Sequence, residues 1–427
     1  MNRYFVTIML ALTYAVSFMD RQIFTILQEQ IKAEFGLSDA QVGLLQGMSF
    51  AIFYGGLAVP VAWIADRANR IRIIYISVAL WSLATTLCGM ASTYTQMVLA
   101  RVGVAVGESG SLAPAHSLIS DLFQPHERAR ALGIFSMGSS VGMICGLAGG
   151  GWVGFHYGWR AAFLIYGAPG LLLALAVKFT ISEPARDERP SSDRVASDTL
   201  LGSVASVLRN PATRVFILCH ALVVLGNYAL LAWLPSLMIR SFEVPQASAG
   251  LAVAALALIA HLPGTFFGGH FGDLLARRTG DLSVLAKMSA LFLAVAFPIE
   301  VAALWMPSFG AMFALVCVAV FLIQMSYGPV LALVQSSVPP GRRAMTAAIM
   351  AFFGNLLGLG FAPVTVGFIS DVTAPAWGLD SLRVGMSAAA AFLIPAALAC
   401  VAAIGSARRI KAPQHCAPAP ELKLGNQ

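Results

Sequence analysis

The chain alternates between long apolar runs and short polar stretches. The apolar runs are about 20 residues long, which is the length at which a helix crosses a bilayer. A transmembrane barrel would instead show short segments of alternating polarity, and the sequence lacks that pattern. The runs therefore predict an all-α membrane protein with twelve transmembrane helices, near residues 5–27, 40–63, 71–90, 95–118, 130–151, 159–181, 213–240, 247–270, 284–304, 309–333, 344–370 and 383–405.

A polar stretch separates the first six predicted helices from the last six. The loop after the second helix and the loop after the eighth both hold an acidic residue followed by clustered arginines. This echo predicts two pseudo-symmetric six-helix bundles, an internal repeat that is typical of transporters whose site lies between the halves. We expect an N-terminal bundle over 1–181, a cytoplasmic linker over 182–210, a C-terminal bundle over 211–405 and a disordered cytoplasmic tail over 406–427.

The basic residues predict the orientation of these helices. With the N-terminus inside, 21 of the 27 lysines and arginines fall on the inner side. Cytoplasmic loops carry such an excess, so both termini are predicted to be cytoplasmic in a multi-pass protein of the inner membrane. Membrane orientation also explains the net charge of +7, and a nucleic-acid partner is not expected.

Composition narrows the possible functions. Of the 427 residues, 58% are hydrophobic and 11% are charged, whereas soluble domains carry about 25% charged residues. None of the six cysteines forms a Cys-x-x-Cys pair, which favours small apolar side chains over metal ligands. The sequence shows no nucleophile–base pair, metal cluster or phosphate loop. An enzyme, a bound metal and a cofactor are therefore not expected.

Several motifs carry a resemblance to a known family. The loop Ala62-Trp63-Ile64-Ala65-Asp66-Arg67-Ala68-Asn69-Arg70 resembles the signature of the major facilitator superfamily, with alanine in place of its first glycine. The chain also resembles the spinster-like branch through Phe18-Met19-Asp20-Arg21 and the segments 101–108, 120–123 and 355–360. The resemblance implies alternating access around a central cavity that is lined by the first and fourth helices. It also implies substrates such as lysolipids and sphingoid phosphates.

Four ionisable residues lie inside predicted membrane spans: Asp20, Arg21, Arg101 and Glu108. Such residues are costly in a bilayer and mark functional sites by default. At 1.5 Å per residue, Asp20 and Arg101 lie at similar depth, which predicts an ion pair between them. Glu108 follows Arg101 by seven residues, two turns along the same face.

We predict that Glu108, Asp20 and Arg101 couple transport to protons. A conformational change that moves Arg101 relative to either carboxyl would switch proton uptake and release. The alternative is a static ion pair that only orients helices. Arg21 lies about 100° around the helix from Asp20; it either binds an anionic substrate group together with Arg101 or extends outward to the membrane surface.

The loop arginines predict a cytoplasmic gate. Asp66 lies at a helix end, where it is expected to interact with Arg70 or Arg130 across the inner face. Such a latch would close one conformation and be broken in the other, although positive-inside topology also explains these charges. The predicted gate consists of Asp66, Arg67, Arg70, Arg130, Asp273 and Arg277.

The second half has almost no charge in its membrane spans. Its polar and aromatic candidates for substrate contact are Asn227, Tyr228, Trp233, Gln324, Tyr327 and Asn355. One charged wall and one neutral, aromatic wall suit an amphipathic or lipid-like organic anion, moved with protons by a monomer in the lipid bilayer. Open alternatives are proton symport of small aromatic or aliphatic carboxylates, drug efflux and, more distantly, a receptor that does not transport.

Overall fold

The protein is described by a computed structural model over residues 2–65, 67–124, 127–184, 200–339 and 342–408. In these ranges the regular elements are helical. The first part of the chain forms α1 (Arg3–Phe35), α2 (Asp39–Gly43), α3 (Ser49–Ala65), α4 (Arg70–Met90), α5 (Tyr94–Glu108), α6 (Leu112–Leu122), α7 (Arg128–Ile144) and α8 (Gly150–Thr180). The second part forms α9 (Leu200–Leu208), α10 (Pro211–Phe242), α11 (Gln246–Leu256), α12 (Leu262–Thr279), α13 (Ser283–Leu304), α14 (Phe309–Ser336), α15 (Arg343–Gly354), α16 (Ala362–Trp377), η6 (Gly378–Asp380), α17 (Ser381–Ala390) and α18 (Leu393–Arg408).

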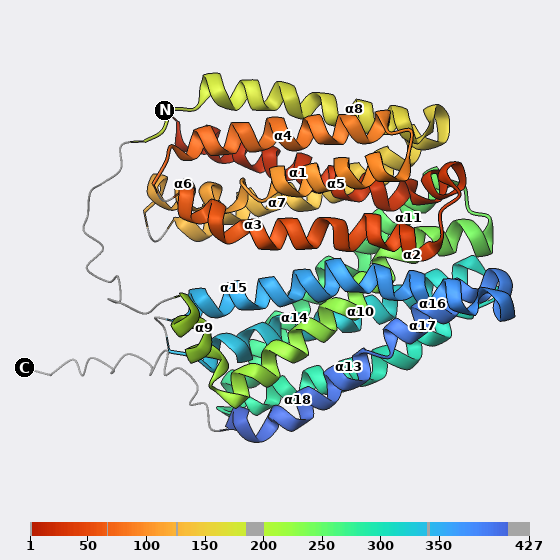
Figure 1. Ribbon diagram of the computed structural model, residues 1–427. Helices are drawn as coiled ribbons and strands as arrows, with labels where there is room; N and C mark the ends of the chain where they lie inside the picture. The colour runs from red at the N-terminus through yellow and green to blue at the C-terminus, as the bar shows by residue number, and fades with distance from the viewer. Residues whose placement is uncertain (1, 66, 125–126, 185–199, 340–341, 409–427) are drawn as a thin grey trace, which may run out of the picture.

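The helices form two groups that lie one above the other in Figure 1. The first group holds α1 to α8 and the second holds α9 to α18, although α11 reaches across to the first group. A helix or a run of helices covers each predicted span. Among the described residues, seven helical runs are long and apolar enough to cross a membrane. The count of twelve spans and the cytoplasmic termini stay predictions, and most of the predicted linker and tail lies outside the described residues.

Side-chain caps set several of the helix starts. The Asn2 side chain accepts a hydrogen bond from the Tyr4 N–H, and Asn69 accepts one from the Arg72 N–H. Ser38 and Gln41 form a reciprocal capping box at the start of α2. These side chains satisfy backbone N–H groups that a helix start leaves without partners. Polar residues at the ends of apolar runs thus fix where the helices begin.

Four helical runs are interrupted by a π-helical segment. These segments are η1 (Leu44–Met48), η2 (Cys145–Gly149), η3 (Ala257–His261) and η5 (Asn355–Phe361). They lie within the second, fifth, eighth and eleventh predicted spans, one in each. Single π-helical turns inside α-helices are rare and often occur at functional sites. Their placement therefore directs attention to the space between these four runs.

Small residues let the run α7–η2–α8 lie directly against α1. A Cβ atom at Gly138 would lie 2.2 Å from the Ala11 carbonyl oxygen, and one at Gly142 would lie 2.1 Å from that of Ala15. The sequence repeats glycine at every fourth position from 138 to 154. This stripe predicts close helix packing, as in other membrane helices, and the contacts confirm it.

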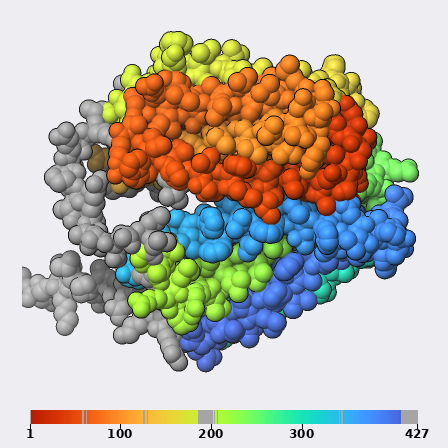
Figure 2. All heavy atoms as spheres, in the orientation of Figure 1, coloured from red at the N-terminus to blue at the C-terminus, as the bar shows by residue number. Residues whose placement is uncertain are grey.

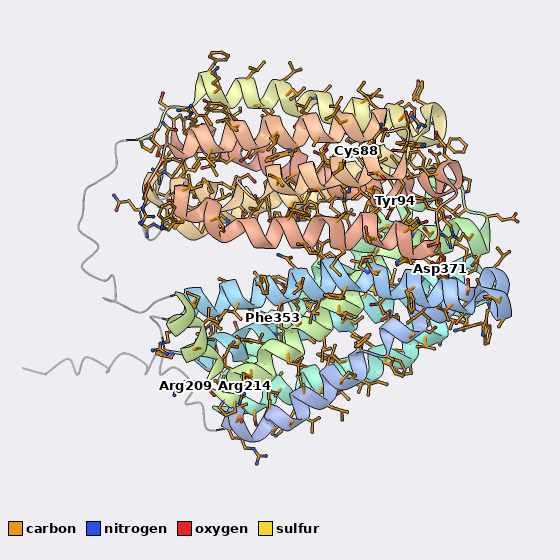
Figure 3. The ribbon with its side chains drawn as sticks, in the orientation of Figure 1. Cys88, Tyr94, Arg209, Arg214, Phe353 and Asp371 are labelled. Atoms are coloured by element: carbon orange, nitrogen blue, oxygen red, sulfur yellow. The ribbon has the colours of Figure 1, made fainter. Side chains whose placement is uncertain are left out.

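The two groups are joined at one end of the molecule. Figure 2 shows them in contact at the right and separated at the left. Figure 3 places Asp371 at the right, beside the first group, and Arg209 and Arg214 at the left. The predicted orientation makes the joined end the outer end, and we call it the predicted outer end below. The opposite end is called the predicted cytoplasmic end.

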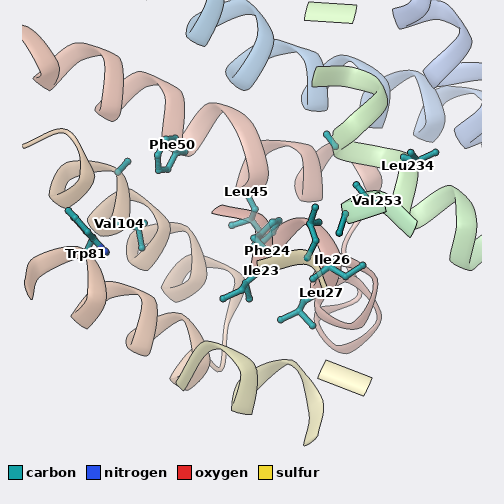
Figure 4. Close-up of a cluster of buried hydrophobic side chains, with 14 of the residues drawn as sticks. Ile23, Phe24, Ile26, Leu27, Leu45, Phe50, Trp81, Val104, Leu234 and Val253 are labelled. Carbon is teal, nitrogen blue, oxygen red and sulfur yellow. The ribbon is translucent and has the colours of Figure 1, made fainter. Parts of the chain in front are cut away.

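An apolar cluster crosses between the groups near the predicted outer end. Figure 4 shows Ile26 of α1 beside Val253 of α11, with Phe24 of α1 and Leu234 of α10 farther to either side. All four side chains are buried within one continuous core. Between membrane helices, association rests on close van der Waals packing rather than on removal of apolar surface from water, and this buried cluster supplies such packing where the groups meet.

Candidate functional site

A cavity of ≈ 250 Å³ lies between the two groups. The first group contributes Arg21 and Arg101 to its wall, and the second contributes Asn227 and Tyr228. Each π-helical segment also contributes at least one lining residue: Gln46, Leu147, Ala257, His261 and Leu359. The cavity is therefore the place where the interrupted helices and the buried charges meet.

Arg21 forms a buried ion pair with Glu108 at this wall. The Arg21 Nη2 atom lies 2.5 Å from Glu108 Oε2, and its Nε donates to the same oxygen at 2.6 Å. The Ser17 hydroxyl donates to this oxygen as well, at 2.9 Å. Glu108 is 1% exposed, and its Oε1 has no hydrogen-bond partner among the described residues. One carboxyl oxygen is thus saturated and the other is left bare.

Aromatic rings surround the Arg21 guanidinium. Its Cζ lies 4.6 Å from the ring centre of Tyr54, 4.8 Å from that of Phe50 and 5.2 Å from that of Phe18. Cation–π contacts of this kind stabilise a cation that has left bulk water. The rings hold Arg21 at the cavity, and the sequence-based alternative in which it extends outward to the membrane surface is wrong.

The predicted ion pair between Asp20 and Arg101 is not formed in the described structure. Asp20 accepts a hydrogen bond from the Thr85 hydroxyl at 2.9 Å, and its Oδ1 has no partner. The Arg101 Nε donates to the Leu45 carbonyl oxygen at 3.4 Å, and its Cζ lies 4.9 Å from the Phe24 ring centre. Similar depth brought the two residues to one level, but the directions of their side chains around the helices differ.

Arg101 is therefore a buried cation with no carboxylate bound to it in the described structure. It is 2% exposed and lines the cavity. A buried charge without a counter-charge is costly, and a bound anion would remove much of that cost. Arg21 and Arg101 line the cavity, whereas Glu108 reaches it only through its pair with Arg21. The three side chains together carry one more positive than negative charge when Glu108 is ionised.

A second cavity of ≈ 370 Å³ lies within the second group. It shares Asn227, Tyr228 and His261 with the first cavity. Gln324, Tyr327 and Asn355 line it, as do His220 and Thr265. Five of the six predicted contacts of this half thus border a cavity. The exception is Trp233, which is fully buried and donates to the Pro363 carbonyl oxygen at 3.0 Å, so it joins α10 to α16 and lines neither cavity.

A hydrogen-bonded ion network closes the predicted outer end. Arg240 of α10 donates to both oxygens of Glu29 at 2.8 Å and to both oxygens of Asp39 at 2.7 and 2.9 Å. Lys32 pairs with Asp39 at 2.5 Å. In return, Asp371 of α16 accepts hydrogen bonds from the first two N–H groups of α2, at 2.9 and 2.8 Å. The contacts that join the two groups here lie more than 200 positions apart in the chain, so sequence spacing does not predict them.

Removing the central cation of this network should separate the groups at that end. Arg240→Ala leaves Glu29 and Asp39 without their shared partner, and a hydrogen bond to a charged group contributes about 1.5–3 kcal/mol. Spin labels at the exposed positions Ala33 and Ala374, in a background without native cysteines, should report a longer distance than in the unsubstituted chain. Arg383→Ala is the matched control because Arg383 pairs with Asp380 inside the second group. An unchanged distance in Arg240→Ala would show that the network does not hold this end closed.

The network should also resist acid. Burial raises the pKa of Asp39, but the hydrogen bonds and charge of Arg240, with those of Lys32 and Ser370, outweigh it and lower the pKa from 3.8 to about 2. A depressed pKa stabilises the closed end above pH 3.8, and this contribution is lost as the pH falls toward about 2. The spin-label distance should therefore stay constant between pH 7 and pH ~4. Opening between pH 7 and 5 would contradict this assignment.

The structure describes five of the six residues of the predicted cytoplasmic gate. Asp66 lies outside the described residues. Arg70 is buried and pairs with Asp121 at 2.5 Å and Glu183 at 2.7 Å, both in the first group. Arg67 stacks on Trp63, with 4.1 Å from its Cζ to the ring centre. The remaining predicted gate residues are exposed: Arg130, Asp273 and Arg277. Arg70 thus ties the loop to α6 and to the end of α8 in this conformation.

The fold and the cavity define the class of protein. A helical membrane bundle with a charged cavity between two groups of helices has the architecture of a transporter. The family model for the Major Facilitator Superfamily matches residues 10–363. The chain belongs to this superfamily, and it is a transporter rather than an enzyme.

Similar proteins agree with this assignment. A crystal structure of a bacterial homologue of the human lysosomal transporter Spinster, in an inward-facing and unoccupied conformation, is 29% identical, with a TM-score of 0.88 over 97% of this chain and 99% of that one. An MFS-type efflux pump of Mycolicibacterium smegmatis is 29% identical over 87% of this chain and 86% of its own. A probable L-galactonate transporter of Escherichia coli is 26% identical over 86% of this chain and 83% of its own.

Proposed function

We propose that the protein is a proton-coupled secondary transporter of an organic anion that works by alternating access in the cytoplasmic membrane. The observation that carries the proposal is the buried pair of Arg21 and Glu108 at the cavity wall, beside the unpaired cation Arg101. This arrangement offers an anion two guanidinium groups, one of which is bound to an internal carboxylate. The relative that is named for L-galactonate transport agrees with an organic anion as substrate.

Competition for Arg21 couples the anion to the proton. When Glu108 takes up a proton, it loses the charge that holds the guanidinium at 2.5 Å, and Arg21 becomes available to a substrate carboxylate. Because linkage is reciprocal, a bound anion that engages Arg21 favours protonation of Glu108 to the same extent. Proton and anion therefore load together, which is the requirement for symport.

Asp20 supplies a second site for a proton in this proposal. It is 1% exposed, and its Oδ1 has no hydrogen-bond partner among the described residues. A buried ionised carboxylate with a bare oxygen is costly, and protonation removes most of that cost. Asp20 is bonded to Thr85 of α4 and lines neither cavity. In this proposal its charge therefore acts on the cavity through its electrostatic effect on Arg21 and Arg101.

The conformation seen here corresponds to the state that is closed at the predicted outer end. The Arg240 network and the apolar cluster hold the groups together there. Opening that end requires closing the other, and this second closure is the task we assign to the loops that carry Asp66, Arg67, Arg70, Arg130, Asp273 and Arg277. Arg70 would then exchange or share its partners Asp121 and Glu183.

Two substrate classes fit the charged wall. A lipid-like anion is favoured by the apolar side chains Phe18, Phe50 and Leu231 around the first cavity. A small carboxylate is favoured by the cavity volume of ≈ 250 Å³ and by the polar lining of the second cavity. Drug efflux would not require the excess positive charge at the wall.

Binding of an anion to the purified protein tests the proposal. Thermal stabilisation should be measured with lysolipids, sphingoid phosphates and small carboxylates, because a ligand of the folded state raises the melting temperature. Arg21→Gln removes a charge-assisted bond and should weaken binding of the stabilising compound by about 10–100-fold. Arg160→Gln, which removes a partly exposed arginine that pairs with Glu34, is the control. An unchanged affinity in both Arg21→Gln and Arg101→Gln would contradict an anion site at this wall.

A further inference from the structure

The second cavity has a different chemistry from the first. It lies between α10, η3, α12, α14, α15 and η5, all in the second group. Its described lining includes two histidines, two asparagines, a glutamine, a threonine and two tyrosines, and it holds no carboxylate, lysine or arginine. A cavity that is rich in uncharged donors and acceptors is suited to hydrogen bonding rather than to charge pairing.

The polar groups of this cavity are partly bonded to one another. Gln324 donates to the Asn227 side-chain oxygen at 3.2 Å, and the Thr265 hydroxyl lies 3.0 Å from the His261 carbonyl oxygen and 3.3 Å from the Gln324 side-chain oxygen. The Asn227 and Gln324 side chains are 8% and 4% exposed, so they are held away from bulk water. The bond between Gln324 and Asn227 uses one donor of Gln324 and one acceptor site of Asn227, so both amides keep hydrogen-bonding capacity for a ligand in the cavity that they line.

Histidine side chains complete the polar surface. His261 borders both cavities, and its buried Nδ1 has no hydrogen-bond partner among the described residues. His220 is 6% exposed, and its ring lies 5.3 Å from that of Tyr327. A buried polar atom without a hydrogen-bond partner destabilises the state that contains it. A ligand that supplies a partner to His261 removes this destabilisation, and one that cannot leaves it in place.

We infer that the second cavity binds a hydroxyl- or carbonyl-bearing part of the transported anion, and that the substrate class is a small hydroxylated acid rather than an alkyl chain. An alkyl chain in this cavity would exclude water from Asn227, Gln324 and His261 without replacing its hydrogen bonds. A hydroxyl group both donates and accepts and so satisfies the same side chains. Sites that are built to hydrogen-bond a substrate hydroxyl reject analogues that lack it.

The inference rests on the proposed anion site, because it places the carboxylate at Arg21 and Arg101 and the neutral part in the second cavity. Asn227, Tyr228 and His261 line both cavities, so the two cavities adjoin, and the inference has one molecule extend from the first into the second. The first group would thus bind the charge and the second group would select the remainder of the molecule. Closing either end requires both groups, so a substrate that spans them is held by both.

Matched acids of equal chain length test the inference. Gluconate and hexanoate are both six-carbon monocarboxylates, and threonate and butyrate are the four-carbon pair. Binding to the purified full-length protein should favour the hydroxylated member of at least one pair by about 10-fold or more, because each lost bond leaves a buried group unpaired. Gln324→Met should bring that ratio close to one, whereas Gln96→Met, which changes an exposed glutamine of α5 outside both cavities, should leave it unchanged.

Each outcome separates this inference from the proposed function. Preference for the hydroxylated acid that disappears in Gln324→Met supports both. Equal or tighter binding of hexanoate or butyrate, with loss of binding in Arg21→Gln, overturns the inference and leaves the anion transporter intact. Binding of none of the four acids, together with binding of a lysolipid, overturns the inference and assigns the lipid-like class. Binding that is unaffected by Arg21→Gln and Arg101→Gln contradicts the proposed site itself.

Discussion

Proton-driven accumulation of substrate should be lost in Glu108→Gln, while binding of the anion is retained or strengthened. Glutamine has nearly the shape of the protonated carboxyl and carries no charge, so it no longer holds Arg21 at 2.5 Å. Arg21 is then available to the anion at every pH, and the pH dependence of binding should largely disappear. Releasing a charge-assisted pair is worth about 1.5–3 kcal/mol, which corresponds to about 10–100-fold in affinity near neutral pH.

Two assays on the same vesicles measure this split. Accumulation against a gradient with an imposed pH difference reports coupling, and exchange of labelled for unlabelled substrate reports binding and conformational change. Glu300→Gln is a matched control, because Glu300 of α13 is also a buried carboxyl, 1% exposed, and lines neither cavity. Loss of accumulation in Glu300→Gln with normal accumulation in Glu108→Gln would place the proton site in the second group.

The second large effect is expected where the two groups touch through glycine. A Cβ atom at Gly47 of η1 would lie 2.5 Å from the Gly360 carbonyl oxygen and 2.6 Å from that of Leu359. Both obstacles are backbone atoms, so a side chain can be accommodated only by moving η1 away from η5. Gly47→Leu should therefore disfavour the state that is closed at the predicted outer end. Overpacking costs about 1–3 kcal/mol, which shifts a two-state equilibrium by about 5–150-fold.

The spin-label distance between positions 33 and 374 measures this shift directly. This distance should lengthen in Gly47→Leu. The rate of substrate exchange should fall, because a smaller fraction of the protein is then closed at the predicted outer end. Gly56→Leu is the control on the same helical run, because a Cβ at Gly56 meets no atom within 4 Å. An equal lengthening in Gly56→Leu would show that the effect comes from a change in helix stability and not from the contact between η1 and η5.

Much of the architecture follows from hydropathy alone. The apolar runs predicted where helices lie, because a bilayer forces backbone groups to bond within a helix. The stripe of glycine from 138 to 154 predicted close packing, which the contacts with Ala11 and Ala15 confirm. Asp20, Arg21, Arg101 and Glu108 could be singled out from the sequence because an ionisable group in a predicted membrane span is costly, and the structure pairs two of them, Arg21 and Glu108.

The pairing within this cluster of four charges was beyond the sequence. Rise per residue gives depth, and it brought Asp20 and Arg101 to one level, but it does not give the mutual rotation of two helices. The mutual rotation of the two helices brings Arg21 into an ion pair with Glu108, and the Arg101 guanidinium instead donates to the Leu45 carbonyl oxygen. The π-helical segments do not rotate these four side chains, because α1 and α5 contain none; η1 enters the cluster only through the Leu45 carbonyl oxygen.

The closure at the predicted outer end shows a second limit. Lys32 and Arg240 each lie at the end of an apolar run, with glutamates two or three positions away in the sequence. Both cations pair with Asp39, which also accepts a hydrogen bond from the Ser370 hydroxyl. Contacts between residues 200 or more positions apart are set by the packing of whole helices. Trp233, a predicted substrate contact, lines neither cavity because its indole bonds to the Pro363 carbonyl oxygen, 130 positions away in the second group.

The central claim is that proton and anion move together through this cavity. The most direct measurement is the internal pH of sealed proteoliposomes when the stabilising anion is added outside, with no membrane potential. The account predicts that the interior acidifies with the unsubstituted protein and that this acidification is absent with Glu108→Gln. Entry of the labelled anion with no change in internal pH, or with a rise, would contradict coupling of the two.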